Sequence, residues 1–152
     1  MRGRPGLQFS ATILLAGDAQ GSAAVTIDLV RKPGSYSLSV RYNGDQGHVG
    51  AADLTSFVID KEDSTATLTA TGQGSNRGLR ASLADADDAH NVVAGVTLAY
   101  FADGEQIGTA STDNNGVSEL PLPPKYRNGH HDYTVRFSGN DYYSSSTAAF
   151  SS

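Results

Sequence analysis

The chain has 152 residues, contains no cysteine and carries a formal net charge of −5 at neutral pH. The lack of cysteine excludes disulfide bonds, thiolate catalysis and zinc–thiolate sites. The net acidity, with 11 Lys and Arg residues that cluster nowhere, argues against a nucleic-acid partner, and no apolar run is long enough for membrane insertion. Residues 1–6 are basic, but the apolar run of a signal peptide does not follow them.

The first 60 residues alternate between apolar and polar side chains over short segments, which is the pattern of half-buried β-strands. The pattern is clearest where every second residue is Tyr, Leu or Val. Gly, Pro, Asn and Asp separate these segments and favour turns. We expect strands at residues 7–9, 23–29, 36–42 and 54–59, with turns at residues 17–21, 32–34 and 43–45.

A short charged segment, residues 60–63, precedes a second series of alternating segments. We therefore expect two units, residues 1–60 and residues 61–152. Prolines at positions 121, 123 and 124 indicate that the end of one strand lies at a sheet edge or leaves the sheet, because proline cannot donate to a central ladder. In the second unit we expect strands at residues 65–70, 79–83, 96–100, 107–112, 118–122, 133–137 and 147–150.

The two units share an internal repeat with a period of 95 residues, the separation of Val40 from Val135. The same shift places Arg41 on Arg136, and it places Gly44 in the turn that follows on Gly139. The first unit has no residues that correspond to the first two strands of the second. Either the chain is a fragment of a longer protein, or a partner strand completes the first unit by pairing at its open edge.

Three runs of the second unit resemble bacterial immunoglobulin-like repeats, which occur in tandem in surface and secreted proteins. These runs are VAGVTL at residues 93–98, TASTDNNGV at residues 109–117, and YTVRFSGN at residues 133–140 with two serines behind it. The resemblance covers residues 63–150 fully and residues 6–59 in part. It implies an all-β, immunoglobulin-like β-sandwich in tandem repeat, with an incomplete first unit and an extracellular or cell-surface location.

One departure from the family pattern concerns a tyrosine at the start of the sixth strand, which in such sandwiches anchors a corner by bonding to the backbone. Tyr36 occupies this position in the first unit, whereas His131 occupies it in the second. We expect the corner of the second unit to be looser, because histidine anchors it less well.

No residues form a recognisable catalytic pattern. His130 and His131 are adjacent and would point to opposite faces of a strand, so they cannot readily share a metal ion. Nucleophile-elbow, phosphate-loop and metalloprotease motifs are also absent from the sequence. We therefore expect no enzymatic activity.

Two groups of side chains are candidates for ligand binding. Carboxylates at turn ends suit calcium, and Asp85, Asp87, Asp88 and Asp113 are of this kind; the alternative is that they are solvated turn residues. Tyr142 and Tyr143 could form an aromatic platform for a sugar, although at least one of them is expected to pack at the base of a strand.

The sequence predicts a non-catalytic structural or adhesive segment of a larger bacterial cell-surface or secreted protein. Its partners would be neighbouring immunoglobulin-like repeats, a surface protein or a glycan. The alternative is an accessory module of a secreted enzyme that binds carbohydrate or calcium. Both readings follow from the family resemblance, since the residues themselves name no ligand.

Overall fold

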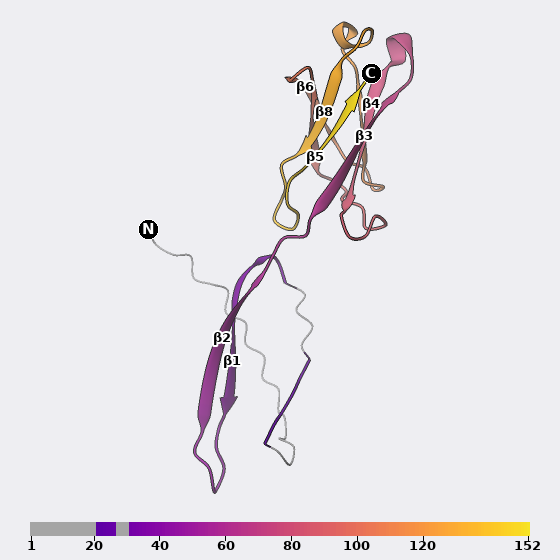
Figure 1. Ribbon diagram of the computed structural model, residues 1–152. Coiled ribbons are helices and arrows are strands. Elements are labelled where there is room, and N and C mark those ends of the chain that lie inside the picture. Colours follow the sequence, from indigo (N-terminus) through magenta and orange to yellow (C-terminus); the bar gives the residue numbers. More distant parts are fainter. Residues whose placement is uncertain (1–20, 27–30) are drawn as a thin grey trace. The chain divides into compact units, whose positions relative to one another are not determined.

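The protein is described by a computed structural model, in which residues 21–26 and 31–152 are placed (Figure 1). The described chain is all-β with antiparallel sheets, and it divides into two compact units, Met1–Asp60 and Lys61–Ser152. The division falls at the start of the charged segment. The predicted strand at residues 7–9 and most of the predicted turn at residues 17–21 lie outside the described residues.

Two strands form the first unit. Strand β1 (Gly34–Tyr42) pairs with β2 (Ala51–Ile59) in an antiparallel hairpin in which Tyr36 stacks on Phe57 with ring centroids 5.8 Å apart. The predicted strand at residues 23–29 is wrong over its described part, because residues 21–26 form no strand and are exposed. Alternation alone makes a strand only where a neighbour takes up the backbone hydrogen bonds.

The second unit contains the seven strands that the sequence predicts, and it has two sheets that share one core. One sheet has the order β3-β4-β7 and the other has the order β6-β5-β8-β9, an arrangement consistent with a β-sandwich (Figure 1). Two 3₁₀ turns, η1 (Gly74–Asn76) and η2 (Pro124–Tyr126), lie in the loops. The strands are β3 (Ser64–Thr71), β4 (Gly78–Asp85), β5 (Thr97–Ala102), β6 (Glu105–Ser111), β7 (Val117–Pro121), β8 (Asp132–Phe137) and β9 (Ser146–Ser151).

The core follows the alternation of the sequence. On β4, Leu79, Ala81 and Leu83 are fully buried, and Arg80 between them is exposed. Removing a leucine side chain from water contributes roughly 1.5–3 kcal/mol, so this row stabilises the contact between the sheets. The other fully buried large side chains of the core are Leu98, Tyr100, Leu122, Tyr133 and Val135.

Strand β7 lies at the edge of its sheet, as the prolines predict. Its only ladder partner among the described strands is β4, with Pro121 opposite Gly78. Gly78 leaves room for this approach, since a Cβ there would lie 3.0 Å from the carbonyl oxygen of Leu120. The proline ends the strand without depriving a neighbour of a donor.

The hairpin β1-β2 of the first unit and the hairpin β8-β9 of the second have the same register. Val40 lies opposite Asp53 in one, and Val135 lies opposite Ala148 in the other. Adding 95 to the residue numbers of the first pair gives the second pair, and this is the same shift that relates the two sequences. The remaining pairs of β8 and β9 follow the same shift.

The turns of the two hairpins are also equivalent. Gly44 and Gly139 have φ values of 86° and 84°, a left-handed conformation that favours glycine. The amide of Asp45 donates to the carbonyl oxygen of His48 at 2.9 Å, and the amide of Asn140 donates to that of Tyr143 at 3.0 Å. Because turn geometry fixes the register of a hairpin, the two turns explain the common register.

Candidate functional site

The chain enters the second unit beside the loop that joins β8 to β9. The amide of Glu62 donates to the carbonyl oxygen of Tyr142 at 2.9 Å, and the amide of Ser144 donates to that of Glu62 at 2.9 Å. Glu62 and Tyr143 thus form an isolated parallel bridge. The entering segment and the loop run in the same direction, unlike the antiparallel pairs of the sheets.

Side chains add to this parallel contact. Lys61 Nζ donates to the carbonyl oxygen of Asn140 at 2.5 Å, and Ser64 Oγ donates to that of Ser144 at 2.9 Å. Ser144 Oγ in turn donates to Asp63 Oδ1 at 2.7 Å, and the hydroxyls of Ser64 and of the first residue of β9 are hydrogen-bonded at 2.8 Å. We call residues 61–64 together with residues 140–146 the parallel clamp.

The parallel direction of the clamp sets how tension along the second unit would load its hydrogen bonds. The chain enters the second unit at the end where β3 begins, and its C-terminus lies at the other end, beyond β9 (Figure 1). Tension between these two ends pulls the two parallel segments in opposite directions along their length. The hydrogen bonds of the clamp then resist together in shear, instead of opening one after another.

The sequence gives no signal for the parallel clamp. Residues 60–63 are predicted as the boundary between units, but from Lys61 onward they bind the second unit's own loop. The contact joins residues about 80 positions apart through backbone groups and serine hydroxyls. Neither alternation nor a local motif reports such a pairing.

The predicted calcium carboxylates close turns. Asp85 Oδ1 accepts the amides of Asp87 at 2.9 Å and of Asp88 at 3.3 Å. Asp113 Oδ1 accepts the amides of Asn115 at 2.8 Å and of Val117 at 2.9 Å, and these bonds lower the pKa of its carboxyl group, with Val117 the larger cause. Within the described residues, no three His, Cys, Asp or Glu side chains are grouped so that they could hold a metal ion.

The two tyrosines of the predicted sugar platform have different roles. Tyr143 is partly buried against the core, and its hydroxyl accepts a hydrogen bond from Asn91 Nδ2 at 3.3 Å. Burial, as the largest cause, raises the pKa of the Tyr143 hydroxyl. The side chain of Tyr142 is 46% exposed. One tyrosine is therefore structural, as expected, and the other presents its ring to solvent.

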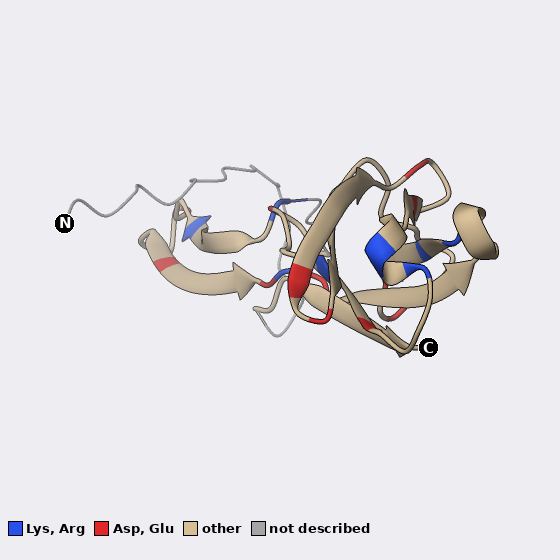
Figure 2. Ribbon diagram, turned by 90° about the horizontal axis from the view of Figure 1, so that it is seen from above, with Lys and Arg blue, Asp and Glu red and all other residues tan. Residues whose placement is uncertain are grey.

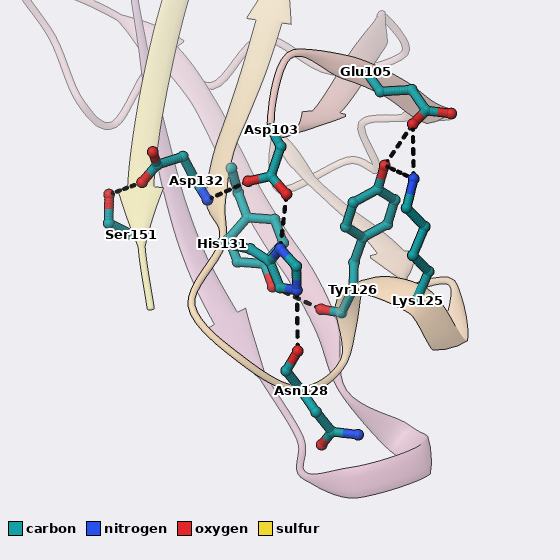
Figure 3. A network of polar contacts seen from close by, with 9 residues as sticks. Asp103, Glu105, Lys125, Tyr126, Asn128, His131, Asp132 and Ser151 are labelled. Carbon is teal, nitrogen blue, oxygen red and sulfur yellow. Dashed lines mark hydrogen bonds and ion pairs between the residues drawn. The ribbon is translucent and has the colours of Figure 1, made fainter.

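A polar network at the far end of the second unit holds His131 (Figure 3). His131 Nδ1 lies 2.8 Å from Asp103 Oδ2, and His131 Nε2 lies 3.0 Å from the carbonyl oxygen of Asn128. Asp103 Oδ1 accepts the amide of Asp132 at 3.0 Å, and this bond is the largest cause of the lowered pKa of the Asp103 carboxyl group. Ser151 Oγ donates to Asp132 Oδ1 at 2.6 Å. Because the serine bonds to an aspartate and not to the histidine, the network ties the turn after β5 to β8 and β9 without assembling a Ser-His-Asp relay.

The expectation of a looser corner in the second unit is wrong. The hydroxyl of Tyr133, two residues after His131, donates to the carbonyl oxygen of Tyr126 at 2.7 Å and is fully buried. The bond from His131 to Asn128 adds a second anchor. The repeat aligns His131 with Tyr36, whereas the anchoring hydroxyl lies two residues further along the chain, at Tyr133 on β8.

Charged residues of both signs are interspersed along the described ribbon (Figure 2). Arg80 pairs with Glu119 at 2.9 Å, and Lys125 pairs with Glu105 at 3.1 Å. These cations are paired on the surface and do not gather into a basic track. Within the described residues, no helix has the length and apolarity that a membrane span would need.

Comparison with protein-family models, with curated proteins and with solved structures found no match.

Proposed function

We propose that the chain is a non-catalytic, structural or adhesive segment of a larger bacterial cell-surface or secreted protein, built from immunoglobulin-like repeats. Two observations support the repeat: the common register of β1-β2 and β8-β9, and their equivalent turns. The strand order of the second unit fits the immunoglobulin-like plan, except that the fourth strand, β6, pairs with β5 instead of extending the sheet of β7.

The observation that carries the structural role is the parallel clamp. A segment that transmits tension between neighbouring domains needs its entering and leaving strands to be held in shear, and Glu62 and Tyr143 provide this arrangement. The side chains of Lys61 and Ser64 reinforce it. Neighbouring repeats of the parent protein are the proposed partners, with a surface protein or glycan reached through the loops.

Single-molecule force spectroscopy tests this role. Because the chain has no cysteine, cysteines introduced at Asp60, just before the parallel clamp, and at Ser152 give unique points of attachment. We expect the second unit to unfold in one step that releases on the order of 300 Å, since an extended chain spans about 3.5 Å per residue. Ser64→Ala removes two hydrogen bonds of the clamp and should lower the unfolding force.

The control for this measurement is Ser75→Ala, which changes an exposed serine in η1 and should leave the unfolding force unaltered. Gradual unfolding without a force peak would overturn the structural role. The same conclusion would follow if Ser64→Ala and Ser75→Ala unfolded at the same force as the parent chain.

A second candidate function is that of an accessory module, for carbohydrate or calcium, in a secreted enzyme. The exposed ring of Tyr142 favours a sugar, because aromatic faces stack on sugar rings. A glycan array probed with the parent chain and with Tyr142→Ala separates the candidates. Specific binding that Tyr142→Ala abolishes would favour the binding module, as would a thermal melting temperature that rises with calcium and falls with a chelator.

A further inference from the structure

Equivalent residues of the two hairpins are buried to very different extents. Val135 and Phe137 on β8 are 0% and 3% exposed, whereas their counterparts on β1, Val40 and Tyr42, are 64% and 45% exposed. The backbone pairing is the same in both hairpins, so the difference does not come from the hairpin itself. We call the face that carries these residues the inward face of each hairpin. The difference in burial comes from the layer that covers the inward face.

In the second unit the covering layer is the hairpin β3-β4. Leu68 on β3 and Leu79 and Leu83 on β4 belong to the same buried cluster as Val135 and Phe137. The parallel clamp continues this layer along the loop between β8 and β9. The second unit thus shows the kind of segment that fits such a hairpin, and in which direction it runs.

We propose that the inward face of β1-β2 is a docking surface for a β-hairpin of a second polypeptide with aliphatic residues at alternate positions, like those of residues 64–85. This inference rests on the repeat relationship of the proposed function, which supplies the template. The incoming leucines pack over Val40 and Tyr42, as Leu79 and Leu83 pack in the second unit. Val40 and Tyr42 are exposed side by side on this face, with Asp53 opposite Val40 on the neighbouring strand.

The loop between β1 and β2 supplies the matching backbone and charge. Gly47 and Val49 correspond to Tyr142 and Ser144, whose carbonyl and amide bind the entering segment in the second unit. Val49 is 90% exposed. A hollow of about 440 Å³, lined by residues 39–43 and 50–52, lies at this end of the hairpin.

Charge complementarity identifies the first residue of the incoming segment. Lys61 Nζ binds the carbonyl oxygen of Asn140, and the counterpart of Asn140 in the first unit is Asp45. The hydroxyl of Tyr42, the amide of Gly47 and His48 lower the pKa of the Asp45 carboxyl group to about 2, so it is ionised at neutral pH. A lysine at the matching position of the partner would therefore reach the carbonyl oxygen of Asp45, in a turn that also carries the negative charge of this residue.

The test uses the full chain and a synthetic peptide of residues 61–86 as the probe. Val40→Cys provides a single thiol on the docking face, and Ser56→Cys provides one on the opposite face, away from the hollow, where the side chain is also exposed. We expect saturating peptide to slow thiol labelling of Val40→Cys at least tenfold and to leave labelling of Ser56→Cys unchanged. The same peptide carrying Leu79→Asp and Leu83→Asp should protect neither thiol.

Three results would overturn the proposal. The first is labelling of Val40→Cys that the peptide never slows, together with an unshifted Val40 methyl signal in the parent chain. The second is slow labelling without peptide at every concentration, which would mean that the chain covers this face itself. The third is protection that grows with protein concentration alone, which would mean a second copy as the occupant. The force measurement probes only the second unit, so either proposal can fail while the other stands.

Discussion

The hairpins β1-β2 and β8-β9 share a backbone and differ in burial. Their turns place glycine at φ near 85° in both cases, at Gly44 and Gly139, and their registers coincide. Val135 is nevertheless fully buried, and Val40 is mostly exposed. Local sequence thus determines turn and register, whereas the covering layer comes from strands far away in the chain.

The consequence for stability is large. An isolated two-stranded hairpin is marginally stable in water, and further strands are needed to bury one face. In the second unit β4 covers the hairpin β8-β9 with Leu79 and Leu83, and β5 extends the sheet of that hairpin with Leu98; all three leucines are fully buried. In the first unit the stacking of Tyr36 on Phe57 covers only one end of the hairpin.

The largest difference should appear when a charge replaces the equivalent valines. Val135→Asp places a carboxylate in the core and should cost more than about 4 kcal/mol, because a buried charge without a partner is not solvated. Val40→Asp should cost no more than about 1 kcal/mol, because the side chain is exposed and the new carboxylate would only meet Asp53 on the opposite strand. Urea unfolding, monitored by the dispersed amide signals of each unit in NMR spectra, measures the free energy of unfolding of both variants. Similar losses from the two changes would mean that β1 is as covered as β8.

A smaller and equal effect is expected at the two turn glycines. Gly139→Ala and Gly44→Ala should each cost about 2 kcal/mol, because a left-handed alanine is unfavourable. The new Cβ would also lie 2.9 Å from the carbonyl oxygen of Tyr143 in one turn and 2.8 Å from that of His48 in the other. Amide hydrogen exchange in each hairpin measures the cost. A loss confined to the second unit would show that the turns are not equivalent.

The hydroxyls that anchor the two hairpins should differ moderately. Tyr133→Phe leaves the buried carbonyl of Tyr126 without its donor and should cost about 1–2 kcal/mol. Tyr36→Phe removes a partly buried bond to the carbonyl oxygen of Lys32 and should cost about 0.5–1 kcal/mol. Thermal melts compare Tyr133→Phe with the parent chain, and hydrogen exchange reports Tyr36→Phe. A melting temperature of Tyr133→Phe equal to that of the parent chain would show that the bond from Tyr133 to Tyr126 does not stabilise the corner.

The smallest effect is a response to acid in one turn only. The pKa of Asp45 is about 2 in the folded turn, below the value of about 3.9 for an unfolded aspartate. The Asp45 carboxylate therefore contributes fully to the stability of the turn above about pH 3.9, and this contribution is lost as the pH falls through about 2. The amide of Gly47, which donates to Asp45, should shift with that midpoint, whereas the amide of Tyr142, which donates to Asn140, should not.

NMR titration of both amides between pH 7 and pH 1.5 follows this response, and Asp45→Asn is the control that should remove it. A midpoint near 3.9 for Gly47 would mean that the carboxylate is not held in the turn. Equal shifts at Gly47 and Tyr142 would point to general acid unfolding.

Much of the second unit can be predicted from the sequence, because its strands alternate and its turns carry Gly, Asn and Asp. Arg80 between Leu79 and Leu83 on β4 is one case, and Pro121 at the edge on β7 is another. These signals are local, so a short window of residues contains them. The same local reasoning extends a strand wrongly over residues 23–26, where no ladder partner is present in the described chain.

The candidate sites could not be predicted in the same way. The bond from Ser64 to Ser144 and the bond from His131 to Asp103 join residues distant in sequence, and serine or histidine in a loop carries no mark of its partner. Asp113, a candidate calcium ligand with a turn residue as the alternative, illustrates the converse. A carboxylate at a turn suits a metal ion and a backbone amide equally, and only the structure shows the amides.

The register of the first hairpin tests the account most directly. We expect cross-strand nuclear Overhauser effects between Val40 and Asp53 that match those between Val135 and Ala148. Contacts from Val40 to residue 52 or 54 instead would contradict the account. A slip of one residue would turn the apolar side chains of one strand to the opposite face and end the equivalence of the two hairpins.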